Sequence, residues 1–132
     1  MTQIFCLFYH QKVTNMRKVV YYLSSCDTCK KIMGQLDLES FDRIDIKNNP
    51  LTEPQLLELY AITESYEELF NKRAIKFRQQ GLNKEELTEN KYKKLLLEEY
   101  TFLKRPVFLI NGELFLGNAK KTVEQLVERL GK

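Results

Sequence analysis

Residues 19–31 read Val-Val-Tyr-Tyr-Leu-Ser-Ser-Cys-Asp-Thr-Cys-Lys-Lys, and this stretch decides the fold. The β-branched and aromatic residues at its start predict a buried strand over 17–23. The spacing of apolar residues further on predicts a helix over 28–38. A Cys-x-x-Cys motif, Cys26 to Cys29, therefore falls at the point where a strand gives way to a helix.

The position of this motif has chemical consequences. The first N–H groups of a helix have no partner inside the helix and carry the positive end of its dipole. A thiolate beside them is stabilised, so we expect a lowered pKa at Cys26, with Lys30 and Lys31 adding positive charge and Asp27 partly opposing it. Cys29 lies one turn further on and can attack a mixed disulfide formed at Cys26.

The order of strand, motif and helix favours a redox cysteine pair over the other interpretations of Cys-x-x-Cys. Two alternatives stay open. Cys6 and His10, in the arrangement Cys-x3-His, would complete a four-ligand zinc site with the motif. Otherwise Cys26 and Cys29 are two inert, partly buried cysteines.

Composition describes an ordinary globular protein. The 132 residues are enough for one domain with a real core, and 30% of them are charged and 43% hydrophobic. The net charge of +3 is too small to indicate nucleic-acid or membrane binding, and no run approaches the ~20 apolar residues of a membrane span. An odd count of three cysteines suits a reducing compartment, so we expect a cytoplasmic protein.

The pattern of predicted elements indicates an α/β fold with a four-stranded mixed sheet in the order β-α-β, helical insertion, β-β-α. A second strand over 41–46 completes the parallel β-α-β unit. The Asn111-Gly112 pair predicts a tight hairpin between two later strands. This is the thioredoxin-like layout. We expect a single domain over 16–132 with the insertion at about 51–103, whereas residues 1–15 read as an N-terminal extension that is not native, or as an extra edge strand.

Caps predict where the helices begin. Thr52-Glu53-Pro54-Gln55 and Ser65-Tyr66-Glu67-Glu68 are capping boxes. Further helix starts are expected at three asparagines, which are Asn83, Asn90 and Asn118. The helix that begins at Asn90 is expected to run through Phe102.

Three segments together give the chain a family resemblance. They are the Cys-x-x-Cys after the first strand, Asn71-Lys72-Arg73, and Lys104-Arg105-Pro106-Val107 with the Asn111–Gly117 hairpin. In their order and spacing they resemble the arsenate reductase (ArsC)/Spx family over about 17–130. The resemblance implies a thioredoxin-like fold and Cys26 as the reactive cysteine.

The resemblance also implies roles for other residues. Pro106 would follow a cis peptide bond and place its loop beside Cys26. Arg105 and Arg73 would bind an anionic substrate. Apart from the resemblance, Ser25 could add a hydrogen bond to the substrate, although a role in forming the turn suits it better. The alternative for each arginine is a surface side chain or a structural ion pair.

The chain also departs from the glutaredoxin-coupled arsenate reductases. Those enzymes have a single catalytic cysteine in this loop, where this chain adds Cys29. They carry another arginine where this chain has Gly117-Asn118, and their insertion arginine aligns most simply with Asn71. Arsenate as the substrate is therefore less well supported than thiol chemistry at Cys26.

Two functions follow. The first is a thiol-dependent oxidoreductase acting on a small oxyanion or a disulfide, with Cys26 as nucleophile and Cys29 as resolving thiol. It needs no bound cofactor or metal, but an external reductant such as the glutathione/glutaredoxin or thioredoxin system. The second is an Spx-like redox-sensing transcriptional regulator that binds RNA polymerase. Neither function involves a membrane or direct binding to nucleic acid.

Overall fold

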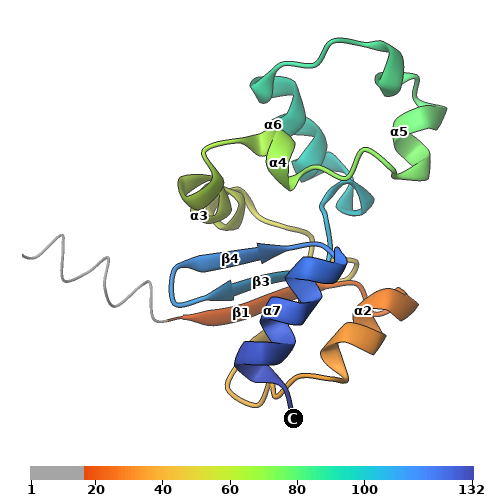
Figure 1. Ribbon diagram of the computed structural model, residues 1–132. Helices are drawn as coiled ribbons and strands as arrows, with labels where there is room; N and C mark the ends of the chain where they lie inside the picture. The colour runs from red at the N-terminus through yellow and green to blue at the C-terminus, as the bar shows by residue number, and fades with distance from the viewer. Residues whose placement is uncertain (1–16) are drawn as a thin grey trace, which may run out of the picture.

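A four-stranded mixed sheet lies at the centre of the protein in a computed structural model that describes residues 17–132 (Figure 1). The strands are β1 (Lys18–Tyr22), β2 (Asp42–Asp45), β3 (Val107–Ile110) and β4 (Glu113–Leu116). Their order across the sheet is β2-β1-β3-β4, with β1 parallel to β2 and antiparallel to β3. The predicted mixed sheet is confirmed, whereas the predictions for residues 1–15 lie outside the described residues.

The β3–β4 hairpin turns as its sequence predicts. Asn111 and Gly112 have φ values of 49° and 86°, and a type I′ turn requires positive φ at both positions. Strand β3 is buried along its whole length, because it pairs on both sides and has both faces covered.

Helices cover both faces of the sheet (Figure 1). Helices α2 (Asp27–Met33) and α7 (Lys120–Leu130) cover one face, where Val20 and Phe108 meet Ile32 and Leu126. The other face carries Tyr21 and packs against the helices that lie between β2 and β3 in the sequence. These are α3 (Glu53–Thr63), α4 (Tyr66–Leu69), α5 (Ile75–Gln79), α6 (Glu89–Glu98) and the 3-10 turns η1 (Leu82–Lys84) and η2 (Tyr100–Phe102).

Local signals fix the starts of α3 and α4. The Thr52 hydroxyl accepts a hydrogen bond from the Gln55 N–H, and the Gln55 side chain accepts one from the Thr52 N–H, so the predicted capping box is present. At α4, Ser65 caps the Glu68 N–H. The carboxylate of Glu89 accepts hydrogen bonds from the first two N–H groups of α4, those of Tyr66 and Glu67, at 2.7 and 3.1 Å, and thereby joins α4 to α6.

Other predicted boundaries are wrong. Helix α2 ends at Met33 instead of continuing to Leu38, because Leu36 leaves the helix and forms a bridge with Gly131. The predicted helix through Phe102 stops at Glu98, and Phe102 belongs to η2.

The three asparagine caps are also wrong. Asn83 lies inside the 3-10 turn η1. Helix α6 is capped by Thr88, whose hydroxyl accepts from the Lys91 N–H, so Asn90 lies inside its first turn. Helix α7 begins after Ala119, one residue beyond Asn118. At α6 the cause is local, because Thr88 lies two residues before Asn90 and its hydroxyl provides the cap. Neither η1 nor α7 has a side-chain cap.

An aromatic cluster holds the inserted helices together. The Phe70 ring lies 4.9 Å from that of Phe102, 5.1 Å from that of Tyr92 and 5.4 Å from that of Phe77, measured between centroids. Phe70 is only 1% exposed, so its truncation would leave a cavity that its neighbours cannot fill.

Replacing Phe70 by alanine is expected to lower the free energy of unfolding by about 3–5 kcal/mol, measured by urea denaturation and circular dichroism. Ile75→Ala is the control, because that side chain is exposed, and it should change stability by no more than about 0.5 kcal/mol. Equal effects of the two substitutions would contradict a central role for Phe70.

Candidate active site

Cys26 lies at the N-cap of α2, in the loop that follows β1. Its N–H donates to the carbonyl of Leu23 at 3.0 Å, and its carbonyl accepts from the Lys30 N–H at 3.2 Å. The loop is also tied to the end of β2. The Asp45 carboxylate accepts from the Ser24 hydroxyl, which is the main reason why the pKa of Asp45 lies below its ordinary value, and from the Ser24 N–H at 3.4 Å. The strand ends thus fix the backbone around the thiol.

The surroundings of Cys26 favour its thiolate. Burial alone raises the pKa of Cys26, but hydrogen bonds and charge outweigh it. The backbone N–H and the thiol of Cys29 both donate to it, the positive charge of Arg105 attracts it, and the N–H of Thr28 donates as well. The net result is a pKa below the ordinary value of a cysteine, and therefore a nucleophilic sulfur.

Cys29 has the opposite character. Its side chain is fully buried, and this burial, together with the neighbouring Cys26 thiolate, raises the pKa of Cys29 to about 11. Both cysteines are free thiols, and Cys26 is the one that is partly exposed. The pair therefore combines an accessible thiolate with a protonated thiol behind it.

Arg105 is held beside this thiolate by the backbone. The Arg105–Pro106 peptide bond is cis, as the resemblance implied. The Arg105 Nη1 donates to the carbonyl of Thr101 at 3.1 Å and, more weakly, to that of Leu103 at 3.4 Å. The pKa of Cys26 responds to this charge, whereas Lys30 and Lys31, which the sequence suggested, are exposed in the last turn of α2.

Backbone hydrogen bonds join a second segment, residues 70–73 of the inserted helices, to the loop that carries Arg105. Phe70 and Leu103 form an isolated antiparallel bridge, in which the Asn71 N–H donates to the Phe102 carbonyl at 2.7 Å and the Lys104 N–H donates to the Leu69 carbonyl at 2.9 Å. The bridge places the segment 71–73 next to Lys104 and Arg105, more than thirty residues away in the sequence.

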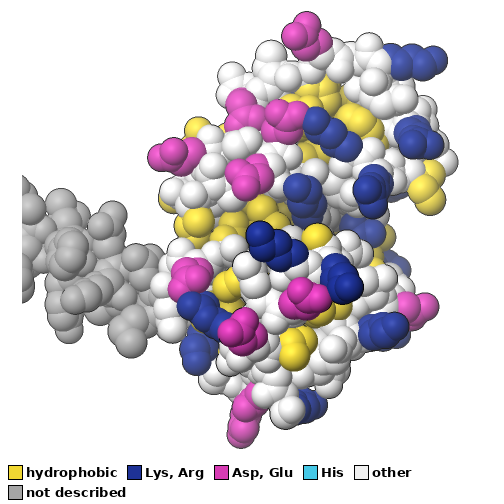
Figure 2. Space-filling view, viewed as in Figure 1, with side chains coloured by type: hydrophobic (Ala, Val, Ile, Leu, Met, Phe, Trp, Pro, Cys, Tyr) yellow, Lys and Arg dark blue, Asp and Glu magenta, His cyan; other side chains and the backbone are white. Residues whose placement is uncertain are grey.

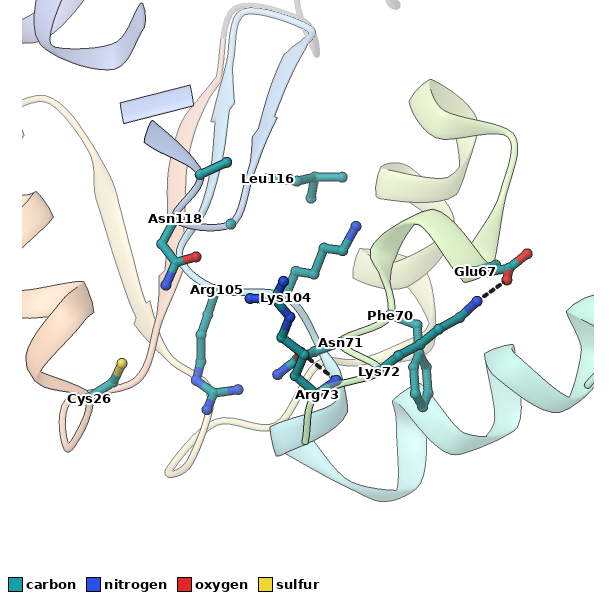
Figure 3. Close-up of a pocket in the computed structure, with 12 residues that line it drawn as sticks. Cys26, Glu67, Phe70, Asn71, Lys72, Arg73, Lys104, Arg105, Leu116 and Asn118 are labelled. Atoms are coloured by element: carbon teal, nitrogen blue, oxygen red, sulfur yellow. Dashed lines mark hydrogen bonds and ion pairs between the residues drawn. The ribbon is translucent and has the colours of Figure 1, made fainter. Parts of the chain in front are cut away.

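Together these segments enclose a cavity of about 990 Å³ (Figure 3). Cys26 lies on one side of it and the Lys72–Glu67 ion pair on the other, with Arg105, Lys104 and Arg73 between them. The residues that line it are Cys26, Glu67, Phe70, Asn71, Lys72, Arg73, Lys104, Arg105, Leu116, Gly117, Asn118 and Ala119. Four cations and a single carboxylate face a reactive sulfur, so the cavity suits an anion.

In a comparison with known protein families, residues 21–126 match the ArsC family. The chain belongs to the ArsC family. Among its curated relatives, the regulatory protein MgsR of Bacillus subtilis strain 168 is 31% identical over 117 residues, which cover 80% of this chain and 93% of the relative. The global transcriptional regulator Spx 2 of Bacillus anthracis is 28% identical over 114 residues, which cover 84% of this chain and 87% of the relative.

Solved structures of ArsC relatives share the fold. An arsenate reductase from Vibrio cholerae superposes with a TM-score of 0.68 at 17% identity, covering 87% of this chain and 98% of that one. An arsenate reductase (ArsC) related protein from Brucella melitensis gives 0.62 at 24% identity, with 83% and 93% covered. The thioredoxin-like α/β fold that the sequence predicted is therefore confirmed.

The ArsC site includes most of the residues that the sequence singled out. Cys26, Arg105 and Arg73 line one cavity, and Cys29 lies behind Cys26. Ser25 is exposed and is not among the lining residues, so a contact between Ser25 and substrate stays a prediction.

Sequence reasoning missed several lining residues. Lys104 is next to Arg105 in the sequence and Lys72 is next to Arg73, so this adjacency could have identified both lysines as lining residues. Asn71 and Asn118 stand where the resemblance places arginines of the glutaredoxin-coupled enzymes, so the alignment was their signal, although the sequence assigned them no role.

Metal binding has no support within residues 17–132. No group of three or more His, Cys, Asp and Glu side chains there could hold a metal ion. The zinc alternative needs Cys6 and His10, which lie outside the described residues, so it stays open. No helix in this part of the chain is long and apolar enough to cross a membrane.

The rate at which iodoacetamide alkylates Cys26 is measured against pH in a Cys6→Ser background. It should reach half its maximum at a pH below ~8.5, the pKa of a free cysteine thiol. Cys29→Ala removes a donor and Arg105→Gln removes a positive charge, so each should move this midpoint to higher pH. Lys30→Gln is the matched control and should leave it in place. Equal alkylation of Cys29 in the native protein, or a Cys26 midpoint at or above that of a free thiol, would contradict this description.

Proposed function

We propose that the protein is a thiol-dependent oxidoreductase in which Cys26 is the nucleophile and Cys29 the resolving thiol. One observation carries the proposal: a partly exposed thiol with a lowered pKa faces a cationic cavity, and a buried thiol lies behind it. Such a pair suits substrates that accept a sulfur nucleophile and carry negative charge, namely a disulfide or a small oxyanion.

The proposed reaction has two steps. The Cys26 thiolate attacks the electrophilic atom, forms a covalent adduct and displaces a leaving group. Cys29 then gives up its proton and attacks Cys26, which releases the reduced product and leaves a Cys26–Cys29 disulfide. An external thiol, from glutathione and glutaredoxin or from thioredoxin, would restore the two thiols. The protein needs no bound cofactor in this scheme.

The cations of the cavity have distinct parts in the proposal. Arg105, which the backbone carbonyls hold, would stabilise the thiolate and the charge that develops during attack. Arg73, whose side chain is exposed and forms no ion pair with another described residue, would bind the anionic part of the substrate. Arsenate fits the charge of the cavity, although the third arginine of the glutaredoxin-coupled enzymes is replaced here by Gly117-Asn118.

A second function is supported by the names of the relatives. MgsR and Spx 2 are regulators, and the chain spans 93% and 87% of their lengths. In this alternative the Cys26–Cys29 disulfide changes the affinity of the protein for RNA polymerase instead of turning over a substrate. Either function places the protein in the cytoplasm, because transcription and the thiol reductants are located there.

Coupled turnover tests the enzyme proposal. Arsenate and a small disulfide are supplied separately, with thioredoxin or with glutathione and glutaredoxin, and NADPH consumption is followed. Cys26→Ser should reduce the rate by at least about 100-fold, and Cys29→Ser should accumulate an adduct at Cys26 that mass spectrometry detects.

Cys6→Ser is the matched control and should keep the wild-type rate. Turnover that survives Cys26→Ser would refute the proposal. Absence of turnover, together with binding of purified RNA polymerase that differs between the oxidised and reduced protein, would establish the second function instead.

A further inference from the structure

Helix α5, which follows the cavity residue Arg73 in the sequence, carries a further exposed cation. Arg73 lines the cavity, and Arg78 lies five residues further along the chain, near the end of α5. Both side chains are exposed, and neither takes part in the ion pairs found within residues 17–132. By contrast, Lys72 and Lys76 are paired with glutamates. Arg73 and Arg78 therefore lack a carboxylate partner among the residues that the structure describes.

An exposed apolar side chain lies between these two arginines in the sequence. Ile75, the first residue of α5, is 75% exposed, which is more than any other large hydrophobic side chain in the described part of the protein. A single exposed isoleucine is ordinary on a protein surface. Its place between two unpaired arginines, next to a reactive cavity, is what distinguishes Ile75.

Charge is unevenly distributed on this face of the molecule. Figure 2 shows Lys and Arg side chains along the hollow between the sheet and the inserted helices and over the part that carries α5. Acidic side chains gather on the opposite side of the inserted helices, over α3 and α4. An acidic ligand would therefore be drawn to the basic side of this face, which includes the hollow and the part that carries α5.

The size of the cavity also points to a large ligand. A volume of about 990 Å³ lies at the upper end of the range that holds ligands much larger than a small oxyanion. The cations inside it are spread from Arg105, beside the thiol, to Lys72 on the far side, so they match separate charges on an extended molecule.

We propose that Cys26 exchanges disulfides with a cysteine of an acidic polypeptide, which enters the cavity as an extended segment and continues across α5. Its carboxylates pair with Arg73 and Arg78, and an apolar side chain packs on Ile75. This inference rests on the proposed thiol chemistry of Cys26 and deepens it by naming the class of its partner.

The exchange is balanced. The Cys26 thiolate attacks one sulfur of the partner's disulfide, forms an intermolecular disulfide and releases the partner's other cysteine as a thiolate. Cys29 then attacks Cys26 and releases the partner's first sulfur as a second thiolate. The proton of Cys29 passes to one of the two partner thiolates, and the other takes a proton from the solvent. The partner gains two electrons and becomes a dithiol, while Cys26 and Cys29 become a disulfide. The external thiol named above restores them.

Synthetic peptides test the docking surface. Each peptide contains one cysteine as a mixed disulfide with 2-thiopyridine, followed by several glutamates and a leucine, and release of thiopyridone gives the rate of reaction with Cys26. A second peptide has glutamine for every glutamate. In low salt the acidic peptide should react about threefold to tenfold faster, and added salt should remove the difference.

Variants on α5 show where the peptide lies. Arg78→Glu should slow the acidic peptide about threefold to tenfold and leave the glutamine peptide nearly unchanged. Its matched control is Lys94→Glu, the same change of charge at an exposed position on α6. Ile75→Ser should slow only the peptide that carries leucine, whereas Val127→Ser on α7 should slow neither peptide.

A neutral small disulfide, 2,2′-dipyridyl disulfide, separates the two levels of the hypothesis. It should react equally with all of these variants, because they leave Cys26 intact. If it fails to react with Cys26 in preference to Cys29, the proposed function fails. If the disulfide reacts with Cys26 while the acidic and the glutamine peptides react at the same rate, the proposed binding surface for a polypeptide is refuted and a small-molecule partner is favoured. The same conclusion follows if Arg78→Glu and Lys94→Glu slow the acidic peptide equally.

Discussion

The antiparallel pairing of β1 with β3 is the constraint on which the site depends. Tyr21 lies opposite Val107, so the end of β1 meets the start of β3. The Cys26 loop follows β1 directly and Arg105 precedes β3 directly, so this register is what brings thiol and guanidinium together. A slip of β1 by one residue would move its buried side chains to the opposite faces of the sheet, which the packing of the core prevents. The geometry of the site is therefore set by apolar packing beneath it.

A second attachment gives the site its other half. The bridge between Phe70 and Leu103 ties the inserted helices to the segment before β3, and the aromatic cluster around Phe70 holds that bridge in place. The two halves differ in character. Arg105 is fixed by backbone carbonyls and acts on the thiol, whereas Arg73 is exposed at the outer part of the cavity. A fixed charge such as that of Arg105 suits control of the pKa of Cys26, and an exposed charge such as that of Arg73 suits the binding of ligands of variable shape.

Local signals predicted most of the sheet but only part of the site. Asn111-Gly112 and the Thr52 capping box act within a few residues, so the sequence alone reveals them. The predicted ends of α2 and α6 were wrong because contacts between residues far apart in the sequence, such as the Leu36–Gly131 bridge, decide where a helix stops. Arg73 and Arg105 came from family resemblance, since no periodicity connects residues that a long-range bridge brings together.

The unequal thiols impose an order on the chemistry, whichever function the protein serves. Cys29 stays protonated because it is buried and because the Cys26 thiolate lies beside it, and its thiol in turn stabilises that thiolate. Once Cys26 enters a disulfide its negative charge is gone. The repulsion and the hydrogen bond that helped to raise the pKa of Cys29 disappear with it, leaving burial as the main reason for a raised value. Attack by the first cysteine thus makes the second easier to ionise. The pair cannot work in the reverse order, because the protonated, fully buried thiol has neither charge nor access until its neighbour has reacted.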